Sequence, residues 1–177
     1  IRRCGKSYMM YQQIQTLLEK KIPLSQIVYV NFEDERLLEM TADDLNTILE
    51  IGLELSGAGN KPYLFLDEIQ NIDGWEKFVR RIADMKYRIS ITGSNSKMLS
   101  GELSTLITGR TIQFEILPFS YSEAKEYMKL TTGSVPENFL SDYIKFGGYP
   151  QRFQMGNESL AHRFLEELYK SIVEKDI

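Results

Sequence analysis

Two short stretches of this sequence carry residue types that act on phosphate groups. The first is Gly5-Lys6-Ser7, the end of the phosphate-binding pattern G-x-x-x-x-G-K-[ST]. In that pattern backbone N–H groups and a lysine hold phosphate oxygens, and the hydroxyl serves a magnesium ion. The second stretch is Asp67-Glu68, which follows the apolar run YLFL at 63–66. Two carboxylates at the end of a buried run are costly unless they serve a metal ion or a reaction.

Gly5-Lys6-Ser7 alone is weak evidence, because Gly and Ser are common wherever a helix begins. Laid over the pattern, its x positions are residues 1–4, and its opening glycine would precede Ile1. A helix predicted at 7–19 follows directly, and the N-terminus of a helix attracts an anion. The apolar run before Asp67 supplies a second site at a strand end. Together these features favour the phosphate-binding interpretation over a chance triplet.

Strand geometry predicts different roles for Asp67 and Glu68. Successive side chains of a strand point to opposite faces, so Asp67 and Glu68 reach different places. We predict that Asp67 joins Ser7 around Mg²⁺, and that Glu68 polarises the water that attacks the nucleotide. The alternative is a strand end with two solvated acids and a helix cap.

The elements that must position these residues alternate along the chain. Strands are predicted at 27–32, 63–66, 88–92 and 111–117, and helices at 7–19, 43–55 and 75–85. Strands separated by helices imply right-handed crossovers and a parallel sheet, hence an α/β fold. Beyond residue 120 the sequence predicts helices, interrupted at FGGYP (146–150). The inward stripes of the three early helices are predicted to be Met9, Met10, Ile14, Leu17 and Leu18; Leu45, Ile48, Leu49 and Ile51; and Trp75, Phe78, Val79 and Ile82.

Composition narrows the class of protein. The 177 residues are 42% hydrophobic and 26% charged, as in globular chains with a real core. A net charge of −4 gives no general attraction to nucleic acid or anionic lipid, although a local basic patch stays open. Cys4 is the single cysteine, so we expect no internal disulfide and a cytoplasmic location. No stretch is apolar enough to cross a membrane. The chain begins inside a motif and ends without a helix-stop signal, so we expect a fragment.

A set of motifs in a fixed order points to one family. The motifs are IRRCGKS, YVNFEDER, YLFLDEIQNIDGWEKFVRR, ISITGSNSKMLS, LITGR, LPFSYSEA and FGGYP. Together they resemble a family of bacterial and archaeal AAA+-type P-loop ATPases, which often carry a C-terminal nuclease-like domain of unknown function. The resemblance covers essentially the whole chain. It implies a P-loop NTPase fold with strand order 5-1-4-3-2 flanked by helices, strand 1 lying upstream of Ile1. We therefore expect an ATPase core at 1–118 and a small helical lid with the start of a following region at 119–177.

The resemblance also implies roles for the residues of the loop. Lys6 would contact the β- and γ-phosphates and Ser7 the magnesium. The backbone N–H groups that would contact phosphate oxygens belong to Cys4, Gly5, Lys6, Ser7 and Tyr8. Arg2 and Arg3 would lie over the phosphates. The alternative for either arginine is a simple ion pair with a nearby acid.

Two later motifs supply candidates for sensing the γ-phosphate. In ITGSNS the candidates are Thr92, Ser94 and Asn95, of which Ser94 and Asn95 are preferred because they lie past the strand end. The alternative is a hydroxyl-rich turn with a capping residue. Arg110 in ITGR would act as an arginine finger or sensor on its own or a neighbouring subunit's nucleotide, which implies self-association. Its alternative is an ordinary surface arginine.

These observations predict an ATP-binding module that hydrolyses ATP with Mg²⁺ and couples the nucleotide state to a conformational change. The alternative is a nucleotide-gated interaction module, or a DNA-associated one, with little hydrolysis. Glu68 favours the enzyme, because a binding module does not need a catalytic base. A small-molecule kinase is a third interpretation, and it would need an acceptor pocket. The identity of a protein or DNA partner stays open, and no membrane partner is expected.

Overall fold

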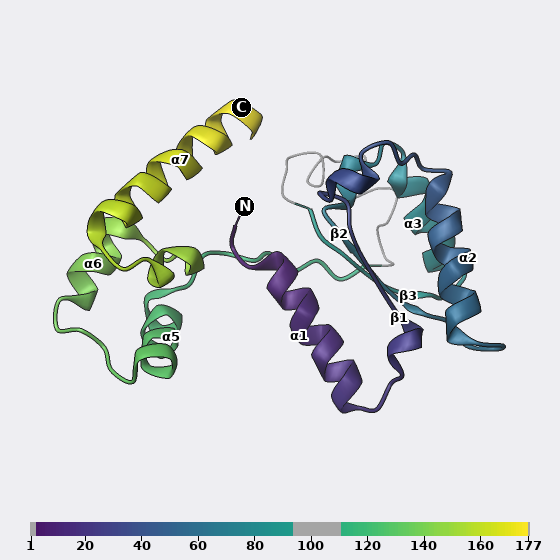
Figure 1. The fold of residues 1–177 in the computed structure, drawn as a ribbon, viewed down its shortest axis with the longest axis horizontal. Helices are drawn as coiled ribbons and strands as arrows, with labels where there is room; N and C mark the ends of the chain where they lie inside the picture. The colour runs from purple at the N-terminus through teal and green to yellow at the C-terminus, as the bar shows by residue number, and fades with distance from the viewer. Residues whose placement is uncertain (1–2, 94–110, 177) are drawn as a thin grey trace. The chain divides into compact units, whose positions relative to one another are not determined.

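The computed structural model describes residues 3–93 and 111–176, with side chains placed as far as Val173. The chain forms two compact units, Ser7–Gln113 on one hand and Ile1–Lys6 with Phe114–Ile177 on the other. The first holds a sheet and its helices, and the second is helical (Figure 1). The predicted division into 1–118 and 119–177 stays a prediction.

The sheet has three parallel strands in the order β1-β2-β3. They are β1 (Ile27–Asn31), β2 (Tyr63–Asp67) and β3 (Arg88–Ile91). Tyr29 pairs with Phe65, and Phe65 with Ser90. β2 is central and its last four residues are buried, as a strand covered on both faces should be. The structure thus confirms the α/β class, the parallel sheet and three of the predicted strands.

One face of the sheet carries the core of this unit. Alternate residues of the strands, among them Leu64 and Leu66, pack against α2 (Asp44–Ser56) and α3 (Trp75–Asp84). The predicted stripe of α3 is confirmed in full, since Trp75, Phe78, Val79 and Ile82 are all buried. In α2 the prediction for Ile51 is wrong, because that side chain is 50% exposed.

The other face is covered by α1 (Lys6–Glu19), seen on the opposite side of the sheet from α2 in Figure 1. Tyr11 and Tyr29 share a hydrogen bond between their hydroxyls at 3.1 Å, and Ser90 donates to Gln13 at 3.0 Å. These contacts are largely polar and aromatic. Met10 alone of the helix is fully buried, and the expected inward positions of Met9 and Leu18 are wrong because both are over 40% exposed.

The predicted strand at 111–117 is absent from the structure, where this segment has no regular secondary structure. Ile112 is 83% exposed and Phe114 76% exposed. β-Branched and aromatic residues favour a strand only where a neighbouring strand receives their hydrogen bonds. In the structure no described strand pairs with this segment, so composition alone was not a sufficient guide.

The second unit contains the predicted helices. They are α5 (Tyr121–Thr132), α6 (Phe139–Phe146) and α7 (Glu158–Asp176), with the short 3₁₀ helix η5 (Pro150–Gln154) between the last two. The ring of Phe153 lies about 6 Å, centre to centre, from the rings of Phe119, Tyr127 and Phe139. Ser120 caps α5 in a reciprocal capping box with Glu123.

The FGGYP segment is a close junction between α6 and the start of this unit. A Cβ atom at Gly148 would lie 1.8 Å from the carbonyl oxygen of Phe119, so only glycine fits there. The N–H of Phe119 donates to the carbonyl oxygen of Gly148 at 2.8 Å. Arg152, 8% exposed, donates to the carbonyl oxygen of Gly147 at 2.7 Å and to that of Asp142 at 3.2 Å. The guanidinium thereby satisfies carbonyls at the negative end of α6.

Candidate functional site

Asp67 is the last residue of the central strand and is almost fully buried, at 1% exposed. Tyr29 on β1 donates its hydroxyl to one carboxylate oxygen at 2.8 Å, and Thr92, just past β3, donates to the other. Among the residues that the structure describes, no ion pair to Asp67 is found. A buried carboxylate held by two neutral hydroxyls keeps lone pairs free, which suits it to a cation.

Tyr29 is a stable donor in this arrangement. Burial, first of all, and then its hydrogen bonds with Tyr11 and Asp67 raise the pKa of the Tyr29 hydroxyl well above its usual value. The hydroxyl therefore keeps its proton throughout the physiological range. The chain of hydroxyls from Tyr11 through Tyr29 links the exposed part of α1 to the buried acid.

Glu68 follows in a left-handed backbone conformation, with φ of 53°. Of the other described non-glycine residues with positive φ, Lys21 and Lys86 lie just past helix ends, where that conformation is usual. Glu68 is buried instead, at 8% exposed, and such a conformation costs about 1–3 kcal/mol. Its N–H donates to the hydroxyl of Thr92 at 3.0 Å. Because the chain turns sharply at Glu68, this residue does not continue the line of the strand that ends at Asp67.

The carboxylate of Glu68 has a partner that the sequence did not suggest. Nε2 of Gln70, in the 3₁₀ helix η3 (Ile69–Asn71), donates to Oε2 of Glu68 at 2.6 Å. Gln70 is itself buried. The one available signal was a pair of polar residues, Gln70 and Asn71, between two isoleucines shortly after a strand. Tyr29 was missed too, although its alternation with Asn31 places it on the Asp67 face of the sheet.

The loop residues lie at the start of α1. Gly5 has φ of 101°, a conformation suited to glycine, and Lys6 is the first residue of the helix. Cys4 is buried, and burial raises the pKa of its thiol. A buried thiol that keeps its proton packs as a small apolar side chain. Tyr8, in the first turn of α1, is 71% exposed.

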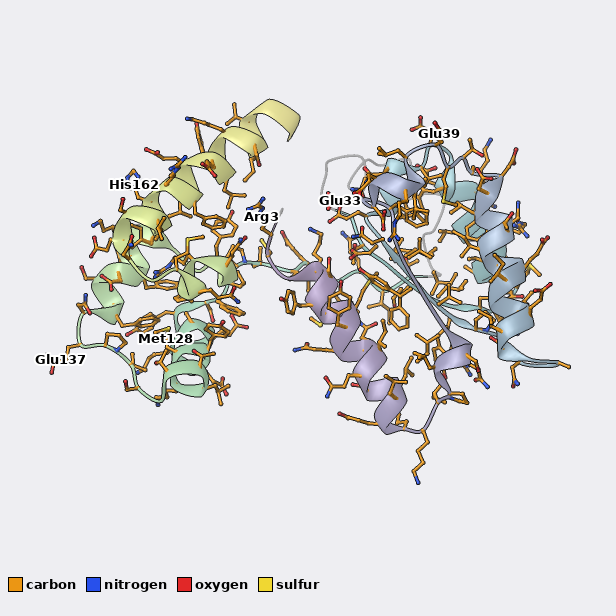
Figure 2. The ribbon with its side chains drawn as sticks, in the orientation of Figure 1. Arg3, Glu33, Glu39, Met128, Glu137 and His162 are labelled. Atoms are coloured by element: carbon orange, nitrogen blue, oxygen red, sulfur yellow. The ribbon has the colours of Figure 1, made fainter. Side chains whose placement is uncertain are left out.

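Arg3, labelled at the start of the chain in Figure 2, is exposed. Nη1 of Arg3 donates to Oε1 of Gln151 at 3.4 Å, and its guanidinium lies 5.8 Å from the ring centre of Phe164. In the described part of the chain no acid forms an ion pair with Arg3, and its placement over the phosphates stays a prediction.

The predicted site residues divide between the two units. Arg3, Cys4, Gly5 and Lys6 belong to the helical unit, and Ser7, Tyr8, Asp67 and Glu68 to the sheet unit. The predicted approach of Lys6 to Asp67 therefore stays a prediction. Arg2, Ser94, Asn95 and Arg110 lie outside the described residues. Of the three sensor candidates, Thr92 is the one that the structure places, in contact with Asp67 and Glu68.

The donor set near β2 fits magnesium better than a metal that needs a protein cage. Within residues 3–93 and 111–176, no group of three or more His, Cys, Asp or Glu residues is arranged to hold a metal. Mg²⁺ is commonly held by one or two protein oxygens together with phosphates and waters, which Asp67 and Ser7 would supply. Glu33, labelled beyond β1 in Figure 2, is exposed. Hydrogen bonds from Arg36 lower the pKa of Asp34 to about 2.

A parallel sheet whose central strand ends in a buried aspartate and a glutamate is typical of P-loop NTPases. Residues 1–125 match the family model described as AAA domain, and the chain belongs to this AAA-type P-loop ATPase family. Membership supports nucleotide binding.

Two curated relatives extend the comparison. An uncharacterized protein of Methanocaldococcus jannaschii is 37% identical over 188 residues, and an uncharacterized protein of Haemophilus influenzae is 34% identical over 180. Both alignments take in all of this chain but 40% and 44% of the respective relative, so the chain spans about two fifths of their length. No solved structure matches. In the described residues, every helix is too short or too polar to span a membrane.

Proposed function

We propose that this module binds ATP with Mg²⁺ and hydrolyses it, coupling the nucleotide state to a change in conformation. The observation that carries the proposal is the end of β2. There Asp67 is buried between two hydroxyl donors, and the next residue, Glu68, is held in a strained backbone conformation. Strain of this kind is retained where it serves function.

The residues would divide the work as follows. Lys6 and the backbone N–H groups of the loop bind the phosphates, and Ser7 and Asp67 would hold Mg²⁺, which neutralises phosphate charge when bound. Glu68 accepts a proton from the attacking water. The water oxygen bonds to the γ-phosphorus as the bond to the bridging oxygen breaks, giving ADP and inorganic phosphate.

Further residues are proposed for control. Ser94 or Asn95 would contact the γ-phosphate, and Arg110 would stabilise the transition state, in its own subunit or in a neighbour after self-association. Helices in 119–177 would act as the lid that responds to the nucleotide. A protein or DNA partner would receive that motion.

Two substitutions in the full-length protein test the proposal. Glu68→Gln removes the base and keeps the phosphate contacts, so ATP affinity is expected to stay while ADP production falls by about 10²–10⁴-fold. Lys6→Ala is expected to lose affinity itself. The measurements are nucleotide titration by calorimetry and steady-state release of ADP.

Normal turnover by Glu68→Gln would show that another group is the base. Equal ATP affinity of the parent and Lys6→Ala would contradict the phosphate site. A parent that binds ATP but releases no ADP would instead indicate a nucleotide-gated interaction module.

A further inference from the structure

Gln70 is a buried polar residue that has no role in the proposed reaction. It lies in the 3₁₀ turn after Glu68 and is 8% exposed. Its Nε2 donates to Oε2 of Glu68 at 2.6 Å. Its other amide atom, Oε1, is buried and has no hydrogen-bond partner within the described part of the chain.

This arrangement is costly for a residue that only fills space. A buried carbonyl oxygen without a donor loses its hydration and gains nothing in return. Methionine has a similar length and would fill the same volume without a polar atom to satisfy. The amide does one thing that methionine cannot, which is to donate a hydrogen bond to the carboxylate of Glu68.

The orientation of that amide follows from the chemistry of its partner. A carboxylate only accepts hydrogen bonds, so the NH₂ end of Gln70 must face Glu68 and the oxygen must face away. A bond of 2.6 Å to a carboxylate is of the strong, charge-assisted kind. It restricts the side-chain torsions of Glu68, whose backbone is already fixed by its N–H bond to Thr92.

We propose that Gln70 is the positioning residue of Glu68. Its carboxamide holds the carboxylate in the one orientation from which it can take a proton from water, without itself touching ATP. This inference rests on the proposed function, because Glu68 must be the base for its orientation to matter. General-base catalysis requires hydrogen-bond reach, so a base that turns freely spends less time in a reactive position.

The main test is Gln70→Met in the full-length protein. We expect kcat to fall about 10- to 100-fold, the size of effect seen when outer-shell partners are removed. KM and ATP affinity should stay within about twofold, because the phosphate contacts are untouched. The midpoint of thermal unfolding should change by only a few degrees, since the lost hydrogen bond is offset by removal of the unsatisfied oxygen.

Asn71→Ala is the matched control. Asn71 is the next carboxamide in the same turn, and its Nδ2 donates to the backbone carbonyl of Phe32 at 3.1 Å rather than to Glu68. It should lower the unfolding midpoint and leave kcat near that of the parent. Loss of kcat in Asn71→Ala equal to that in Gln70→Met would mean that disturbance of the turn explains both.

Gln70→Glu separates positioning from packing. With one proton shared between the two carboxyl groups, the new Glu still donates to Glu68; with none, the two groups repel. Asp67, the adjacent acid in the sequence, and Tyr29 are unchanged in this variant. We therefore expect the ratio of variant to parent kcat to fall as pH rises. A packing defect would lower the ratio equally at all pH values.

The outcomes distinguish this inference from the function beneath it. A parent that hydrolyses ATP, with full kcat in Gln70→Met, would overturn the role of Gln70 and leave the function standing. A parent with no ATP hydrolysis, or with full turnover in Glu68→Gln, would overturn the proposed function and this inference with it.

Discussion

At the scale of single residues, the site depends on neutral donors around a buried acid. Tyr29 lies on β1 and Thr92 directly follows β3, the two strands that flank β2, so the sheet itself brings them to Asp67. Neither donor carries a charge that would compete with a cation. The arrangement holds the carboxylate in place and leaves its electrostatic field available.

Tyr29→Phe tests that arrangement. It removes the hydroxyl and leaves the ring, and we expect the free energy of unfolding to fall by about 1–2 kcal/mol, as for a hydrogen bond to a carboxylate that is partly shielded from water. Urea unfolding at pH 7 measures it. Tyr11→Phe is the control, because it removes the neighbouring hydroxyl and keeps the bond to Asp67, and its effect should be smaller.

The hydrogen bond between Tyr29 and Asp67 also predicts how the stability of the protein depends on pH. The pKa of Tyr29 is raised in the folded state, so its contribution to stability is complete below the ordinary tyrosine value of about 10 and is lost as pH rises above it. The difference in stability between the parent and Tyr29→Phe should therefore shrink above about pH 10. A difference that grows there would contradict the assigned hydrogen bond.

At the scale of elements, the capping box of α5 is a local and separable feature. The hydroxyl of Ser120 accepts from the N–H of Glu123 at 3.3 Å, and Glu123 accepts from the N–H of Ser120 at 2.7 Å. The Ser120 hydroxyl also donates to the Glu123 carboxylate at 2.7 Å, and this hydrogen bond, followed by the one from the Ser120 N–H, lowers the pKa of Glu123. The contribution of Glu123 to stability is therefore complete at pH values above the ordinary pKa of glutamate. It is lost as the pH falls below that pKa.

Ser120→Ala should cost about 1 kcal/mol of stability at pH 7. The loss should become smaller in acid, because protonation of Glu123 weakens the hydrogen bond that it accepts from the Ser120 hydroxyl, and the variant lacks this bond at every pH. Ser159→Ala is a suitable control, since Ser159 lies exposed in the first turn of α7. Circular dichroism during thermal unfolding at pH 7 and pH 3 measures both variants, and an equal loss at the two pH values would show that Glu123 contributes nothing.

The helices and strands also show how much of the fold could be predicted from the sequence. The stripe of α3 was predictable because four apolar residues at helical spacing meet a sheet face that is itself apolar. The stripe of α1 was only partly so, because that helix meets a face lined by Tyr29 and Ser90, and periodicity does not report what a helix meets. The strand expected at 111–117 failed for the same reason, since pairing needs a neighbour.

The residues of the candidate site were also only partly predictable from the sequence. Asp67 and Glu68 were predictable because adjacent acids after an apolar run stand out in the sequence. Their partners were harder, because a hydroxyl from another strand or an amide two residues away has no distinctive pattern. Tyr29 and Gln70 become visible only when the register and the left-handed turn at Glu68 are known.

At the scale of the whole molecule, nucleotide binding should appear as stability. A ligand that binds only the folded state adds about 2.7 kcal/mol when present at 100 times its dissociation constant. ATP with Mg²⁺ should therefore raise the unfolding midpoint of the full-length protein by several degrees. Differential scanning calorimetry measures the shift.

Lys6→Ala should abolish that shift, and Lys20→Ala, which removes an exposed lysine just past the end of α1, should keep it. A shift of equal size in all three proteins would mean that ATP binds without Lys6. No shift in the parent would contradict nucleotide binding altogether.

Trp75 allows the unfolding of the sheet unit to be followed by fluorescence. It is the chain's single tryptophan, and as the first residue of α3 it is 3% exposed in the core of the sheet unit. Its fluorescence reports on solvent reaching the core of the sheet unit. Residues 114–177 hold tyrosine and phenylalanine but no tryptophan, so they are silent at tryptophan wavelengths. A melt followed by emission and by far-ultraviolet circular dichroism thus assigns each transition to one unit, with no label introduced.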